Sequence, residues 1–480
     1  MDLNKQIFNA TKWSSITELA AKLVNPLSTV ILARLLTPDA FGILVTATML
    51  ISFAELFTDA GFQKYLIQHE FESDDDKYKY TTVAFWCNLF LSLLLWGIIS
   101  VFTFPIARFV GCSGYELVIP ISCLSIPLAA FSSIQMALFK RHFDFKTLFY
   151  VRLVGVLMPL LITVPLAAIT RSFWSLIIGM IALNLSNAVI LTVKSPWKPS
   201  LFFDFNRLKQ MFSFSIWSMF ESITIWLTSY LDAFIVGSFL NQFYLGVYRT
   251  SISMVGQIMG LVTAATTPVL YSSLSRLQND DNEYLKLFFN FQKFVGIMVI
   301  PLGVGIFLFR DLIVEVLLGD QWISAAYFLG LWGLMSSITV VFAHYSSEVY
   351  RSKGKPKLSV CAQISHIVVL CPVVLFFVNK GFDTLCAARA FVRLELVLVN
   401  FIIMYCFFKI SPMKMVFNNL SAIIASIIMA LVYLFLPKFS NFYYNAIYVP
   451  ICIAIYFAVI FCFPQERLIL KNLKFFLKKK

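Results

Sequence analysis

The chain has 480 residues and a formal net charge of +13; 59% of its residues are hydrophobic and 13% are charged. Soluble domains carry about 25% charged residues, so this composition excludes an ordinary soluble protein. The apolar residues stand in blocks of roughly 18 or more, long enough for a helix to cross the bilayer core. The blocks are about twice as long as membrane barrel strands and show no alternation, so we expect an all-α integral membrane protein.

Taken in chain order, the apolar blocks predict about 14 transmembrane helices. Turn residues separate the blocks, for example Thr37-Pro38-Asp39 after the first and Lys355-Pro356 in the second half. The expected spans are 13–36, 41–60, 81–106, 115–139, 149–169, 172–193, 211–240, 247–273, 291–309, 322–345, 357–378, 384–408, 415–436 and 443–463.

The distribution of basic residues gives the expected orientation. An even number of spans leaves both termini on one side, and that side carries 27 of the Lys and Arg residues against six on the other. Cytoplasmic loops carry such an excess, so we expect both termini to be cytoplasmic. The positive charge therefore reflects membrane topology, and no nucleic acid partner is expected. The basic tail at 464–480 is interpreted either as a helix lying on anionic membrane lipid or as a solvated tail.

The sequence also repeats itself weakly. A shift of 204 residues places Trp13 on Trp217 and Gly42 on Gly246. We therefore predict two pseudo-symmetric six-helix lobes, 1–193 and 194–410, followed by two additional transmembrane helices at 411–463. Parallel repeats of this kind are a transporter architecture.

Five segments resemble a known family, the multidrug/oligosaccharidyl-lipid/polysaccharide (MOP) exporter superfamily. The similarity is to its polysaccharide-transporter branch of Wzx-type lipid-linked oligosaccharide flippases and covers about residues 1–410. The segments are ARLLTPDAFGI at 33–43, FTDAGFQKYLIQ at 57–68, ALFKRHFDFK at 137–146, YLDAFIVGSFLNQFYLGVY at 230–248 and EVYRSKGKPK at 348–357.

The resemblance implies a V-shaped pair of lobes that alternates access across a bacterial cytoplasmic (inner) membrane. The implied cargo is an undecaprenyl-diphosphate-linked oligosaccharide, moved to the outer leaflet for O-antigen, capsule or exopolysaccharide synthesis. A polysaccharide polymerase and glycosyltransferases are the implied partners.

Basic residues within the predicted spans are candidates for cargo binding, because a buried charge normally faces a cavity or a partner. Arg389 and Arg393 lie four residues apart and share a helix face, which suits a diphosphate or, alternatively, an internal ion pair such as one with Glu395. The other candidates are Lys22, Arg249 and Arg152. For Arg249 and Arg152, extension to the membrane interface is the alternative.

Three acidic residues are candidates for coupling to an H⁺ or Na⁺ gradient, namely Glu18, Glu221 and Asp232. Glu18 stands four residues before Lys22, a spacing that equally favours an ion pair within one helix. His344 and His366 are expected to be packing residues.

Two other functions stay open from the sequence. A multidrug/cation antiporter of the same superfamily would need lone acids and few cations in its path. A membrane-embedded polymerase or ligase usually needs a large outer loop with paired acids or histidines, and no predicted outer loop has them. The nine cysteines contain no CxxC pair. We therefore expect a transporter with no catalytic residues, metal or cofactor.

Overall fold

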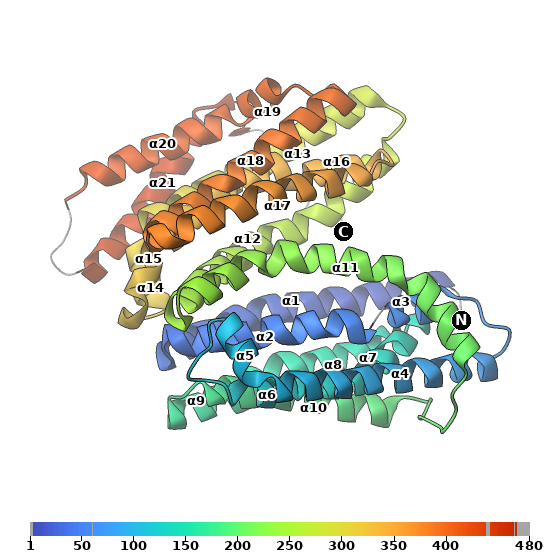
Figure 1. Ribbon diagram of the computed structural model, residues 1–480. Coiled ribbons are helices and arrows are strands. Elements are labelled where there is room, and N and C mark those ends of the chain that lie inside the picture. Colours follow the sequence, from blue (N-terminus) through green and yellow to red (C-terminus); the bar gives the residue numbers. More distant parts are fainter. Residues whose placement is uncertain (1–2, 60, 438–441, 465, 468–480) are drawn as a thin grey trace. The chain divides into compact units, whose positions relative to one another are not determined.

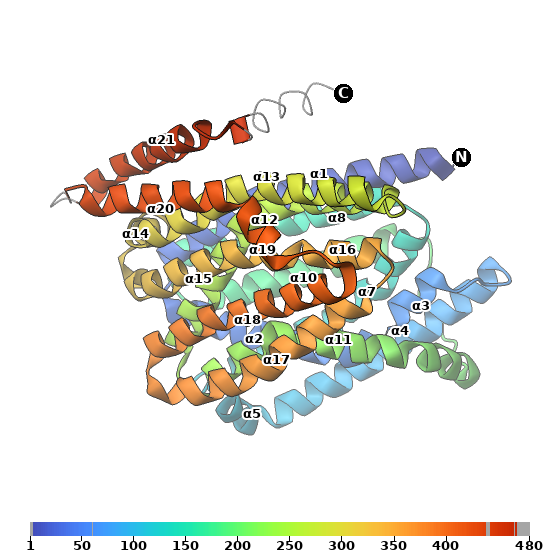
Figure 2. The same ribbon diagram turned by 90° about the horizontal axis from the view of Figure 1, so that it is seen from above.

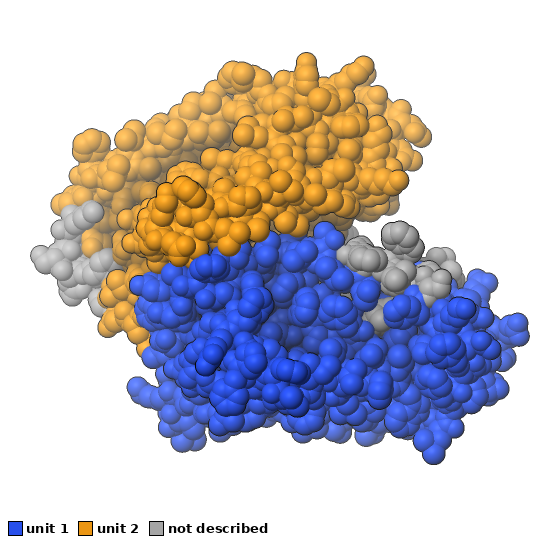
Figure 3. Space-filling view, in the orientation of Figure 1, with its two compact units in different colours: residues 1–249 blue, residues 250–480 orange. Residues whose placement is uncertain are grey.

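The computed structural model describes residues 3–59, 61–437, 442–464 and 466–467, and within these ranges the chain is helical without a β-strand (Figure 1). The expected all-α membrane fold is confirmed. Internal contacts divide the chain into two compact units, Met1–Arg249 and Thr250–Lys480 (Figure 3). The boundary between the two units lies at residues 249 and 250, which is not the boundary of the predicted repeat. The predicted lobes 1–193 and 194–410, the added helices at 411–463 and the tail at 464–480 stay predictions.

Unit 1 is built from helices of very different length, and polar side chains cap the N-termini of some of them. The helices are α1 (Leu3–Leu35), α2 (Pro38–Asp59), α3 (Phe62–Gln68), α4 (Asp74–Val101), α5 (Thr103–Phe109), α6 (Val118–Cys123), α7 (Ser125–Arg141), α8 (Phe145–Met158), α9 (Val164–Thr170), α10 (Trp174–Lys194), α11 (Phe205–Phe239) and the start of α12 (Gln242–Arg276). Ser73 caps α4 by accepting from the backbone N–H of Asp76 at 3.1 Å, and Asp204 caps α11. Side-chain caps satisfy amide groups that have no partner within the helix.

Helices α4, α7, α8 and α10 run side by side in unit 1 (Figure 1). A π-helical segment, Pro159–Thr163, joins α8 to α9. Gly179 of α10 packs so closely against this segment that a Cβ would lie 1.9 Å from Oγ1 of Thr163. Small residues allow membrane helices to approach in this way.

Unit 2 holds the remaining helices. They are α13 (Asp281–Leu308), α14 (Arg310–Leu317), α15 (Ala326–Thr339), α16 (Ser346–Ser352), α17 (Lys357–Phe377), α18 (Phe382–Phe408), α19 (Pro412–Asn418), α20 (Leu420–Phe435) and α21 (Tyr448–Phe461). Helix α15 packs against both α13 and α18, and α17 packs against α18. Helix α20 packs on α13 and on α21 (Figure 2). The Tyr456 hydroxyl of α21 donates to the carbonyl of Ile297 in α13 at 2.8 Å.

Eleven helices of the described residues are long and apolar enough to cross a membrane, or up to 12 when the bent pair α19 and α20 is taken as one span. The predicted first span falls on α1, many of whose side chains lie outside the described residues, so this span stays a prediction. The last, Asn445–Phe461, is apolar but shorter. The chain is a multi-pass membrane protein, and the count of about 14 stays a prediction.

Candidate functional site

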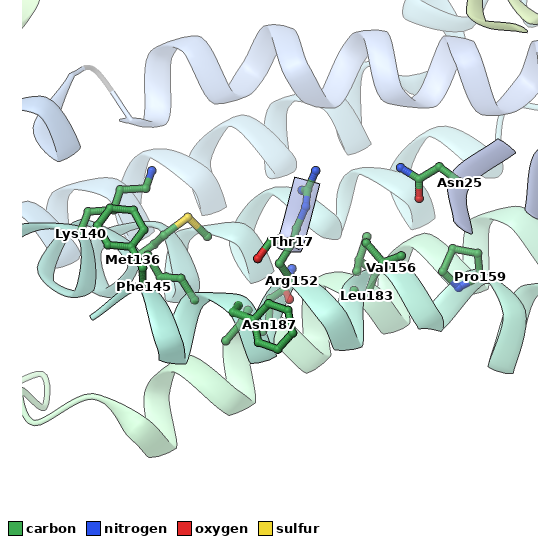
Figure 4. Close-up of a pocket in the computed structure, with 14 residues that line it drawn as sticks. Thr17, Asn25, Met136, Lys140, Phe145, Arg152, Val156, Pro159, Leu183 and Asn187 are labelled. Atoms are coloured by element: carbon green, nitrogen blue, oxygen red, sulfur yellow. The ribbon is translucent and has the colours of Figure 1, made fainter. Parts of the chain in front are cut away.

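A cavity of about 590 Å³ lies in unit 1 among α1, α7, α8 and α10 (Figure 4). Arg152 projects into it from α8 and Lys140 from α7, and the two cationic groups point to the same side in Figure 4. Gly155 stands one turn after Arg152 and also lines the cavity. The cavity therefore offers two positive charges beside the amide groups of Asn25 and Asn187.

A second cavity of about 370 Å³ adjoins the first and shares Met136 and Asn187 with it. Its lining is dominated by amides and hydroxyls, with one acid and one base among the described residues. The polar lining residues are Ser52, Glu55, Thr58, Gln63, Lys64, Asn88, Ser132, Ser133, Asn184, Asn187 and Ser222. Unit 1 thus holds two hollows that share part of their lining and have polar groups in their walls.

The Arg389–Arg393 pair lies in unit 2 around one aromatic ring. The guanidinium carbons stand 4.7 Å and 4.3 Å from the ring centre of Trp332 on α15. Arg393 also donates to the hydroxyl of Ser336 at 2.8 Å, and Arg389 is 7% exposed. The structure therefore places both arginines on the same face of α18. Their role in cargo binding stays a prediction.

Glu395 is held by the neighbouring helix α17. Its carboxylate lies 3.0 Å from Nδ1 of His366 and accepts from the hydroxyl of Ser365 at 2.9 Å. His366 is thus a buried residue with an identified partner. His344 lies 3.2 Å from the hydroxyl of Thr267.

The remaining predicted site residues are Asp232, Arg249, Lys22, Glu18 and Glu221. Asp232 is 2% exposed and accepts from the Tyr248 hydroxyl at 2.8 Å. Arg249 lies 5.0 Å from the ring centre of Tyr230 and donates to the carbonyl of Ser229 at 2.9 Å, which ties it to α11. Lys22 is half-buried in α1. The side chains of Glu18 and Glu221 lie outside the described residues.

Sequence reasoning missed Lys140, Trp332 and the amides of α10. Asn184 and Asn187 are three residues apart in a mostly apolar span, and this spacing puts them on one helix face. That pattern was the available signal. Lys140 falls just outside the predicted span 115–139, and nothing in the sequence pairs Trp332 with α18.

Cations, amides and hydroxyls line hollows among helices that can cross a membrane, an arrangement that suits transport of a polar solute. Comparison with known proteins agrees. A sequence profile of the family described as polysaccharide biosynthesis protein matches residues 31–327, more than half of the chain. The chain belongs to this family.

Individual relatives point the same way. An uncharacterized membrane protein in the cps region of Klebsiella pneumoniae is 24% identical over 383 residues, covering 78% of this chain and 77% of that protein. The succinoglycan biosynthesis transport protein ExoT of Rhizobium meliloti (strain 1021) is 22% identical, covering 70% and 67%. In fold, the chain is similar to the solved lipid II flippase MurJ in its inward closed conformation, with a TM-score of 0.75, 14% identity and coverage of 95% and 99%.

These findings confirm the resemblance to the polysaccharide-transporter branch of the MOP superfamily. They also confirm that the chain is a membrane transporter of polysaccharide biosynthesis and not an enzyme.

Proposed function

We propose that the chain is a flippase that moves an undecaprenyl-diphosphate-linked oligosaccharide from the inner to the outer leaflet of the bacterial cytoplasmic membrane. The observation that carries this proposal is the cationic cavity of unit 1, which lies within membrane-spanning helices and adjoins an amide-rich hollow. A diphosphate needs cations, and a guanidinium donates to phosphate oxygens in pairs. Sugars need neutral donors and acceptors, while a polyprenyl tail needs only the surrounding lipid.

The names of relatives support the same cargo class. The relative in Rhizobium meliloti is a succinoglycan transport protein, and the structural neighbour flips lipid II. We assign Arg152 and Lys140 to the diphosphate in unit 1, and Arg389 and Arg393 to the same chemistry in unit 2. Lys22 and Arg249 stay secondary candidates for cargo contact.

The transport cycle is proposed as alternating access by two lobes, with both termini in the cytoplasm. Asp232, Glu221 and Glu18 are the proposed positions for coupling to H⁺ or Na⁺. A polymerase and glycosyltransferases are the proposed functional partners, because the cargo must be assembled on one side and consumed on the other. A cation-exporting drug antiporter fits less well, since the cavity lining is itself cationic.

The test is made in cells that lack the gene. Loss of the chain is expected to abolish surface polysaccharide and to leave lipid-linked repeat units in the inner leaflet. Restoring the chain with Arg152→Ala or Lys140→Ala is expected to return little polymer at normal protein abundance.

Lys146→Ala is the matched control. Lys146 follows Lys140 by six residues and belongs to α8. Its side chain is exposed and does not line the cavity. This variant should restore wild-type polymer. Normal surface polymer in the deletion strain would refute the flippase assignment.

A further inference from the structure

The second cavity of unit 1 has the chemistry of a carbohydrate site. Its polar groups come from several helices: α2 supplies Glu55, α4 supplies Asn88, α7 supplies Ser132 and Ser133, and α10 supplies Asn184 and Asn187. A volume of about 370 Å³ lies within the range of ordinary small-molecule sites. Such a gathering of amides and hydroxyls in one hollow of a membrane protein suits a polar ligand.

The hydrogen bonds already present hold these side chains in place. Nδ2 of Asn88 donates to the hydroxyl of Ser133 at 2.8 Å, and Oδ1 of Asn88 accepts from Ser92 at 3.3 Å. Nδ2 of Asn184 donates to the carbonyl of Met180, one turn back on α10, at 3.2 Å. The amides are therefore oriented before any ligand arrives.

Asn187 is the exception. Its Oδ1 is buried and has no hydrogen-bond partner among the described residues. Leaving a buried acceptor without a hydrogen-bond partner is unfavourable. Asn187 lines both cavities, so its side chain lies at the junction that a ligand spanning them would cross.

The two cavities differ in the charge of their linings. The first presents Arg152 and Lys140, whereas the described lining of the second balances Glu55 with Lys64. An anion is therefore attracted to the first cavity, and an uncharged hydroxyl-rich group suits the second, where amides supply both donors and acceptors.

We infer that the second cavity is the saccharide subsite of the cargo, with the Asn187 amide turning to accept a hydrogen bond from the sugar next to the diphosphate. This inference rests on the proposed function, because the diphosphate fixes which sugar reaches the junction. A site that hydrogen-bonds sugar hydroxyls rejects a ligand that lacks them, since its own buried groups are then left unpaired. The identity of the groups in the second cavity thus sets which repeat unit is accepted.

The experiment measures binding to the purified full-length chain with two probes. One is inorganic pyrophosphate, and the other is the oligosaccharide repeat unit released by hydrolysis of the surface polymer. Asn187→Leu and Ser133→Ala are expected to weaken oligosaccharide binding about 10-fold, the effect of about 1.4 kcal/mol from one lost buried hydrogen bond. Ser133 lines the second cavity and not the first, so Ser133→Ala should bind pyrophosphate as the wild type does.

Arg152→Ala should give the opposite result, with weaker pyrophosphate binding and unchanged oligosaccharide binding. Asn290→Leu, an exposed asparagine of α13, is the control for the leucine substitution and should leave both unchanged. Unchanged oligosaccharide binding in both Asn187→Leu and Ser133→Ala overturns the saccharide subsite, and so does the absence of oligosaccharide binding to the wild type. The proposed function is judged separately by polymer loss in the deletion strain, so either claim fails without the other.

Discussion

Gly42 and Gly246 stand 204 residues apart at matching positions of the repeat, and within unit 1 each lies against the backbone of the other's turn. A Cβ on Gly42 would lie 1.9 Å from the carbonyl oxygen of Gln242, and one on Gly246 would lie 1.9 Å from that of Pro38. Gln242 also accepts from the Thr46 hydroxyl at 3.0 Å. The starts of α2 and α12 therefore meet without side chains between them.

The first prediction follows from this contact. Gly42→Ala and Gly246→Ala are each expected to lower the unfolding temperature of the detergent-solubilised chain, because backbone atoms must move; overpacking of this kind costs about 1–3 kcal/mol.

Gly256→Ala, in the same helix α12, is the control. No atom lies within 4 Å of a Cβ at Gly256, and alanine is the better helix former, so this variant should be at least as stable as the wild type. Equal stability of all three variants would contradict the close contact.

The second prediction concerns the arginines around Trp332. Arg389→Ala and Arg393→Ala are expected to reduce surface polysaccharide at normal protein abundance, because each removes a cation from the proposed phosphate contact. Arg393→Lys should restore polymer only partly, since an ammonium lacks the planar group that stacks on Trp332 and donates in pairs.

The control is Arg276→Ala, at the exposed end of α12. It should behave as the wild type. Wild-type polymer from both alanine variants of α18 would remove the phosphate-binding role.

A structural feature could be predicted from the sequence when a local property of the chain determines it. Bilayer thickness sets span length, so hydropathy located the helices. It missed their ends, because α4 begins at Asp74 rather than near 81 and α11 at Phe205 rather than near 211. The extra turns lie outside the apolar blocks and are held by the caps at Ser73 and Asp204.

For the candidate site, too, only the local features could be predicted from the sequence. Helical spacing was enough to put Arg389 and Arg393 on one face. Their partner Trp332 lies 57 or more residues earlier in the chain, and α1, which lines the cavity together with Arg152, is also distant from it in sequence. Such contacts arise from packing between helices, which no local pattern records. For the same reason His366 gave no sign of its pairing with Glu395.

The third prediction concerns a buried ion pair near the end of the described chain. Nζ of Lys293 on α13 lies 3.0 Å from Glu466, which also accepts from the Ser421 hydroxyl at 2.7 Å. Removing one partner leaves the other charge buried, so Lys293→Met or Glu466→Gln should destabilise the chain by about 3–5 kcal/mol. The double variant should lose less stability than the sum of the losses in the two single variants.

This pair also predicts a pH dependence. Burial alone would raise the pKa of the Glu466 carboxyl, but the hydrogen bonds from Ser421 and Lys293 outweigh it and hold the pKa below the usual value. The folded chain then binds fewer protons here than the unfolded chain, so the contribution is present above the unfolded pKa and is lost as pH falls through the folded pKa. Thermal unfolding of wild type and Glu466→Gln between neutral and acidic pH checks this. A stability difference that does not shrink on acidification would contradict it.

The fourth prediction tests the orientation of the chain. Gly114, Gly354 and Gly381 all have positive φ, and none has an atom within 4 Å of a Cβ position, so cysteine at each carries a comparable backbone strain and meets no neighbour. In a background without the nine native cysteines, we expect a membrane-impermeant thiol reagent added to intact cells to label Gly114→Cys and Gly381→Cys. Gly354→Cys, beside the basic residues Lys353 and Lys355, should be labelled only after the membrane is opened, because basic loops stay in the cytoplasm. Labelling of Gly354→Cys in intact cells, with Gly114→Cys protected, would reverse the orientation and with it the direction in which the cargo enters the cationic cavity.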